Sequence, residues 1–204
     1  AMMVRDHAAL LAFYLKRSEE AMLSLESLLE RTDLNDRVAA ACKLTLGDIY
    51  AFEGMIWDAS LLFSQVVLDF GDDPIGHEAK FRNARVSYFG GDFGWAQSQL
   101  DALKASTSKL ISNDAIELSL LITDNFNLDT LTEPMEMYAR ADLLRMQRKF
   151  DVARATLDSL AEISDLDTTI VIKSTVPIGT HQEIKTYLAS KGLDLPVLNN
   201  PEFL

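Results

Sequence analysis

The sequence predicts a mainly α protein, an α-solenoid of antiparallel helix pairs with a small β-α-β appendage. Two observations lead to this fold class. Over residues 2–163, apolar residues recur at helical spacing and small residues return at intervals of similar length. Near residue 165 the pattern changes to consecutive β-branched residues, which is typical of a strand buried on both faces. We therefore expect a helical repeat domain over residues 2–163 and a β-α-β segment over residues 164–204.

The repeat is clearest in residues 46–63, LGDIYAFEGMIWDASLLF. Weaker copies begin at residues 83 and 140, and a degenerate copy lies upstream. We expect the small residues to lie where two helices touch and the large ones to fill the space beside them. The pattern residues stand at offsets 0, 1, 4, 8, 13 and 17, and they are Leu46, Gly47, Tyr50, Gly54, Ala59 and Phe63.

The alanine at offset 13 marks the interval between copies. It falls at positions 21, 59, 96 and 153, so the successive spacings are 38, 37 and 57 residues. The last interval leaves room for an extra helix, which the apolar spacing places at residues 113–126. Trp57 and Trp95 take neighbouring positions in two copies, and we expect them to be packing residues.

This pattern resembles the tetratricopeptide repeat family, and segments such as LGDIYAFEG resemble repeat proteins of the Bacteroidetes bacteria. The resemblance covers roughly residues 2–163 and implies stacked helix pairs that offer a concave groove to a peptide or protein segment. The expected function is a non-catalytic scaffold, and the alternative for the groove surface is a solvated helix face. The expected groove residues are Leu44, Asp48, Phe52, Lys80, Phe81 and Arg85.

Composition narrows the function classes. The formal net charge of −12 argues against nucleic acid or an anionic membrane as the main partner. The single cysteine, Cys42, excludes an internal disulfide and is expected in the core. The three histidines share no metal-ligand spacing, so no metal site is expected. We find no signal peptide and no apolar run long enough to span a membrane, which leaves a cytoplasmic or a periplasmic location open.

The C-terminal segment has the order of a β-α-β unit. Ile170, Val171 and Ile172 form a β-branched run, and a turn at residues 177–179 leads into a helical pattern. The last stretch, LPVLNNPEFL, is expected to be a second strand. Two strands alone leave open sheet edges, so two alternatives remain: the segment fills the array's own groove, or its strands pair with a second copy of the chain.

Two motifs in this segment resemble the UDP-glucose and GDP-mannose dehydrogenases, which are NAD-dependent enzymes. IKSTVPIGT at residues 172–180 matches the family's Ser-Thr-Val-Pro-x-Gly segment, and NPEFL at residues 200–204 matches its Asn-Pro-Glu-Phe-Leu segment. The resemblance implies that Thr175 lies near the nicotinamide and that Glu202 takes part in acid–base chemistry. It also implies that Phe203 and Leu204 contact the substrate.

Other parts of such an enzyme are missing from this sequence. No G-x-G-x-x-G follows a strand, so we expect no phosphate-binding turn and no bound cofactor. Cys42 does not take the place of the family's nucleophilic cysteine, which lies far downstream of these motifs. The chain is therefore not expected to act as an enzyme. The alternative to the scaffold is a truncated or fused fragment of a UDP-glucose 6-dehydrogenase-type enzyme that is inactive alone.

Overall fold

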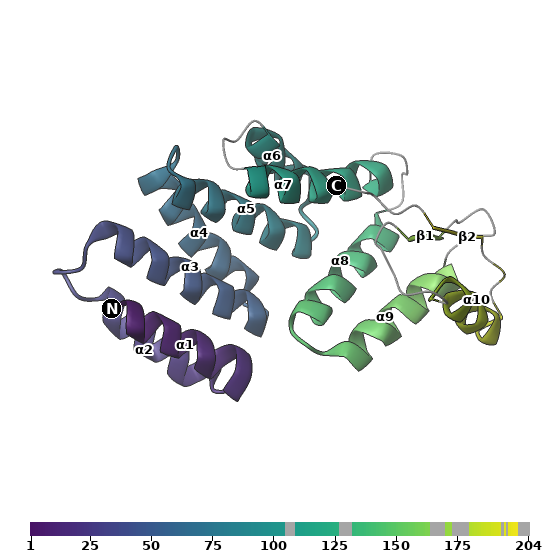
Figure 1. Ribbon diagram of the computed structural model, residues 1–204, viewed down its shortest axis with the longest axis horizontal. Helices are drawn as coiled ribbons and strands as arrows, with labels where there is room; N and C mark the ends of the chain where they lie inside the picture. Colours follow the sequence, from purple (N-terminus) through teal and green to yellow (C-terminus); the bar gives the residue numbers. More distant parts are fainter. Residues whose placement is uncertain are drawn as a thin grey trace.

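The computed structural model describes residues 1–104, 109–126, 132–163, 170–172, 180–192, 194 and 196–199. Within them the chain is mainly helical, which confirms the expected mainly α class (Figure 1). None of the described helices combines the length and the apolar character needed to cross a membrane. The helices are α1 (Met2–Leu15), α2 (Ser18–Leu29), α3 (Asp36–Glu53), α4 (Ile56–Phe70), α5 (Pro74–Phe89), α6 (Phe93–Lys104), α7 (Lys109–Phe126), α8 (Glu133–Met146), α9 (Phe150–Ile163) and α10 (Thr180–Ser190), and the strands are β1 (Ile170–Ile172) and β2 (Val197–Asn199).

Helices α1 to α7 form a stacked array. Each helix packs against the next one in the chain, and α1 contacts α3, α3 contacts α5 and α5 contacts α7. Helices α1, α3, α5 and α7 therefore form one continuous layer, the inner layer, and α2, α4 and α6 form a second layer packed against it (Figure 1). The extra helix expected at residues 113–126 is α7, which begins earlier, at Lys109, and continues the inner layer.

Local sequence signals set the ends of these helices. Asn35 caps α3, because its side chain accepts a hydrogen bond from the backbone N–H of Arg37. Asp73 caps α5 through the N–H of Ile75, and Pro74 takes the first helical position, where a missing N–H has no cost. Gly54 ends α3 at φ 88°, a left-handed conformation that glycine adopts without strain.

The repeated small residues lie at the helix contacts. Ala21, Ala59 and Ala96 are all fully buried, and Ala153 is 6% exposed, which confirms the packing role expected from their spacing. Gly47 lies directly against the ring of Phe63, since a Cβ at Gly47 would be 2.5 Å from Phe63 Cε1. Only a glycine allows α3 and α4 to approach this closely around that ring.

Helix α8 runs across the C-terminal ends of the inner-layer helices (Figure 1). Near its start, Met135 and Ala139 join the same apolar cluster as Tyr88 of α5. Just after its end, the Gln147 side chain lies beside Gly54 at the end of α3. The guanidinium of Arg148 then stacks on the ring of Tyr14 in α1, 4.9 Å from its centroid. Helix α8 and the two residues after it therefore cover part of the C-terminal end of the inner layer.

The C-terminal segment is tied to the array through α9. Strands β1 and β2 pair in parallel, with Val171 opposite Leu198, and α10 packs on β2. On the other side, Asp158 of α9 accepts hydrogen bonds from the Tyr187 hydroxyl and from Lys191 Nζ, the latter at 3.0 Å. Helix α9 is thus the element that joins the two parts.

Candidate functional site

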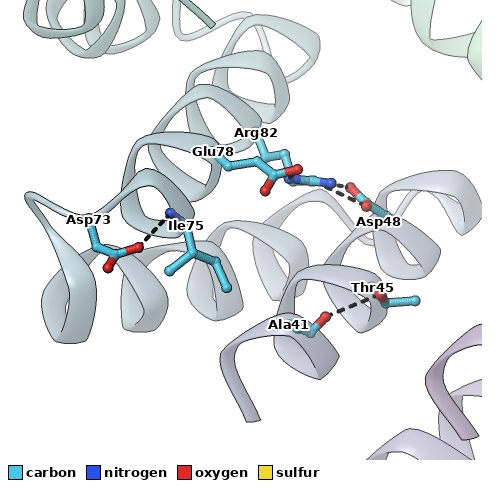
Figure 2. A network of polar contacts seen from close by, with 7 residues as sticks. All are labelled: Ala41, Thr45, Asp48, Asp73, Ile75, Glu78 and Arg82. Atoms are coloured by element: carbon cyan, nitrogen blue, oxygen red, sulfur yellow. Dashed lines mark hydrogen bonds and ion pairs between the residues drawn. The ribbon is translucent and has the colours of Figure 1, made fainter. Parts of the chain in front are cut away.

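The expected groove residues come from α3 and α5, two neighbouring helices of the inner layer. Asp48 of α3 accepts the Arg82 Nε–H at 3.0 Å, and Arg82 also pairs with Glu78 at 2.7 Å (Figure 2). This network joins two neighbouring helices of the inner layer. Arg82 was not among the expected residues, because its separation of 34 residues from Asp48 does not match the spacings of 38 and 37 residues between the first copies.

The network shapes the charge of this surface. Burial raises the pKa of Asp48, and the nearby Arg82 and Arg85 only partly oppose this effect. Burial also works against the charged form of Arg82, but Asp48 and Glu78 outweigh it and raise the Arg82 pKa. The surface therefore has mixed charge, with each carboxylate close to a guanidinium.

The apolar groove candidates mainly serve packing. Leu44 is only 5% exposed and belongs to the core cluster around Phe63, so it is not on an open surface. Phe52 meets Phe13 of α1 edge to face, with ring centroids 5.3 Å apart. Phe81 is half-buried against the cluster that contains Tyr88. Offsets placed these residues on the correct helices, but they do not tell which side of a helix is covered by a neighbour.

The basic candidates differ in exposure. Lys80 is half-buried, whereas Arg85 is exposed and its guanidinium lies over the ring of Phe89 at 5.7 Å. The structure brings Asp48 and Arg85 within electrostatic range of each other, with Arg82 between α3 and α5. These three residues form the polar part of the surface that a ligand of the inner layer would meet.

Two expectations about single residues have clear outcomes. Cys42 is fully buried with a free thiol, and burial raises its pKa, so the expected core position is confirmed. The expectation that Trp57 and Trp95 are packing residues is wrong. Trp57 is 75% exposed and Trp95 is 54% exposed, because both lie in the first turns of α4 and α6, which none of the described helices covers at these positions.

The dehydrogenase-like residues cannot be placed. Thr175, Glu202, Phe203 and Leu204 all lie outside the described residues. The described part of this region consists of β1, α10 and β2, with Leu188 and Val197 buried. Within the described residues no group of three or more His, Cys, Asp or Glu side chains is arranged to hold a metal ion.

Comparison with known proteins assigns a similarity to the C-terminal part of the chain. Residues 132–204 match the family model described as the UDP-glucose/GDP-mannose dehydrogenase family, NAD binding domain. The UDP-glucose 6-dehydrogenase of Rickettsia typhi is 32% identical over 99 residues, which is 46% of this chain and 21% of that protein. The chain thus spans about a fifth of the length of this relative. No solved structure matches the chain.

Proposed function

We propose that residues 132–204 are part of an NAD-binding domain of the UDP-glucose/GDP-mannose dehydrogenase type, and that this chain alone does not oxidise nucleotide sugars. The similarity over these residues carries the first half of the proposal. Parallel pairing of β1 and β2 around α10 is consistent with it, because such domains are built from β-α-β units. On this proposal the dehydrogenase-like part of the chain begins at α8, and not at residue 164 as the sequence pattern suggested.

The second half rests on the binding chemistry of NAD. Dinucleotide-binding domains hold the pyrophosphate on backbone N–H groups of a glycine-rich turn that follows a strand. This sequence contains no such turn, and its Gly90-Gly91 pair follows a helix of the array. The proposed domain part therefore lacks its own phosphate-binding element.

Calorimetry with NAD, and absorbance of NADH with UDP-glucose or GDP-mannose as substrate, test the proposal on the full chain. We expect neither saturable NAD binding nor NADH formation. Turnover that is lost in Glu202→Gln but kept in the matched Glu183→Gln would contradict the second half. Nuclear Overhauser contacts between Val171 and Leu198 test the first half, and their absence would contradict the domain assignment.

We further propose that α1 to α7 form a tetratricopeptide-like array that binds a protein or peptide segment. The continuous inner layer, with its cross-helix charge network, favours this second function. Helix α8 crosses the C-terminal ends of the layer, so the proposed binding surface is the part that carries Asp48, Lys80 and Arg85. A purely structural array, or pairing of the β1 and β2 edges with a second copy, is the alternative.

Selection from a displayed random-peptide library on the immobilised full chain tests the array proposal. Enriched peptides should lose binding to the Lys80→Glu/Arg85→Glu double variant, because it reverses the charge of the proposed surface. They should keep it with Lys16→Glu/Arg31→Glu, which makes the same charge change elsewhere. Absence of enrichment would contradict the array proposal, and light scattering at the monomer mass would contradict pairing of copies.

A further inference from the structure

A hollow between α4, α5 and α6 is distinct from the α3–α5 surface. It has a volume of about 350 Å³ and lies where the first turns of α4 and α6 meet the last turn of α5. The residues that line it include two tryptophans, Trp57 and Trp95, two aliphatic residues, Ile56 and Val86, and one acidic residue, Asp92. Ligand pockets usually measure roughly 300–1,000 Å³, so this hollow has room for a side chain and not for a large cofactor.

The two tryptophans are unusual because they are large and yet exposed. Trp57 is 75% exposed and Trp95 54% exposed, although both line the same hollow. Each carries an exposed indole ring, and the face of an indole ring is the strongest cation–π acceptor among side chains. Such exposed tryptophans contribute little to the core, so packing alone does not account for them.

Charge decides which ligand this aromatic hollow fits. Among the residues that the structure describes, no lysine, arginine or histidine lines it, and α4 contains none along its whole length. The basic residue of α6, Lys104, lies in its last turn and pairs with Asp101 at 2.8 Å. Arg85, the nearest basic residue along the chain, is engaged over Phe89.

Asp92 adds a negative charge to the hollow. Its Oδ1 accepts the backbone N–H of Trp95, and no ion pair to Asp92 occurs in the part of the chain that the structure describes. The N-termini of α4 and α6 carry partial positive charges, which repel a cation. The carboxylate of Asp92, at the start of α6, offsets the charge of that helix. The net charge of −12 then attracts cations to the whole molecule.

We propose that this hollow binds an arginine or lysine side chain of a basic peptide segment. The cationic group lies over the indole faces of Trp57 and Trp95, near the Asp92 carboxylate, and its aliphatic stem contacts Ile56 and Val86. In this proposal the indole rings and the Asp92 carboxylate bind the cation together. It does not depend on either function proposed above.

Intrinsic fluorescence tests the proposal directly, because the chain contains two tryptophans and both line the hollow. The full chain is titrated at constant ionic strength with the capped peptide Gly-Arg-Gly-Arg-Gly. The matched control peptide carries citrulline, which has the shape of arginine without the charge. We expect a saturable change with the arginine peptide and binding at least about five-fold weaker with the citrulline peptide.

Three variants locate the binding. Trp57→Ala, read through Trp95, and Asp92→Asn should each weaken binding about three- to ten-fold. Asparagine preserves the helix cap at position 92, so this loss reports the charge and not unfolding. Asp69→Asn makes the same change of net charge at the other end of α4 and should leave the affinity unchanged.

Each contrary result overturns the proposal. Equal binding of the arginine and citrulline peptides would show that charge is not recognised. Tighter binding of a tetraproline peptide would assign the hollow to polyproline recognition instead. An equal effect of Asp69→Asn and Asp92→Asn would reduce the interaction to the general field of the chain, and no saturable change at all would leave the hollow without this ligand.

Discussion

The contact between Gly47 and Phe63 gives a clear prediction at the residue scale. Alanine is favoured over glycine inside a helix by about 1 kcal/mol. At position 47, however, the added methyl group would lie 2.5 and 2.8 Å from two ring carbons of the buried Phe63. Overpacking of this kind costs roughly 1–3 kcal/mol. The overpacking cost less the helix gain leaves roughly 0–2 kcal/mol, so Gly47→Ala should lower the free energy of unfolding by up to about 2 kcal/mol in urea denaturation.

Two further variants separate crowding from other causes. Gly94→Ala, in α6, adds a methyl group with nothing within 4 Å and should not destabilise the chain. Adding Phe63→Leu to Gly47→Ala should cost less than the sum of the two single changes, because the smaller side chain removes the clash. Additive effects would show that the contact is not the reason for a glycine at this position.

Asp73 links stability to pH. The backbone N–H of Ile75 and, after it, Arg37 hold the pKa of Asp73 below its usual value. Its contribution is therefore complete above the unfolded pKa of about 4 and disappears as the pH falls through the lower folded pKa. At pH 7, Asp73→Asn keeps the cap, loses the ion pair with Arg37 and should lower Tm by about 1–4 °C.

Melting curves at pH 7 and pH 3 measure this difference. The gap in Tm between the original chain and Asp73→Asn should be narrower at pH 3, where the carboxylate is partly protonated. Asp72→Asn removes a charge from the neighbouring residue and serves as the control. A gap that is as wide at pH 3 as at pH 7 would exclude the ion pair as its cause.

At the scale of elements, the helices and their small contacts were predictable, but their tertiary neighbours were not. The offsets of Ala21, Ala59 and Ala96 report a local period, and all three are fully buried. Trp57 lies two residues before Ala59 in the same repeat copy, yet it is exposed, because spacing does not tell which helix faces meet a neighbour. The charge network at Asp48 and the position of α8 depend on contacts between distant residues, which one sequence does not encode as a visible pattern.

The attachment of α8 is open to a direct test. Ala139 is 1% exposed in the cluster that contains Tyr88, so Ala139→Glu would bury a charge there. We expect faster hydrogen exchange in α8 and α9, with exchange in α1 and α2 unchanged, since the apolar cluster that holds those two helices includes no residue of α8. Arg140→Glu introduces the same side chain at an exposed position and should have little effect. Faster exchange throughout the array would mean that α8 is required for its folding.

For the whole molecule, the question is where the array ends and the dehydrogenase-like part begins. The similarity starts at residue 132, whereas α8 packs into the array through Met135 and Ala139. Helix α9 has a different position, since it packs on α8 and holds α10 through Asp158. The two parts therefore share α8 and α9, and the sequence periodicity could not place a boundary inside a shared helix pair.

Shortened chains distinguish the contributions of these elements. The described members of the three apolar clusters extend no further along the chain than Met146, so a chain ending at residue 163 should keep a cooperative helical transition with Tm within about 3 °C of the full chain. A chain ending at residue 126 loses α8 and uncovers Tyr88, and its Tm should fall by more. Circular dichroism melts measure both. Equal Tm values for the two shortened chains would show that α8 adds nothing to the array, and would assign it wholly to the dehydrogenase-like part.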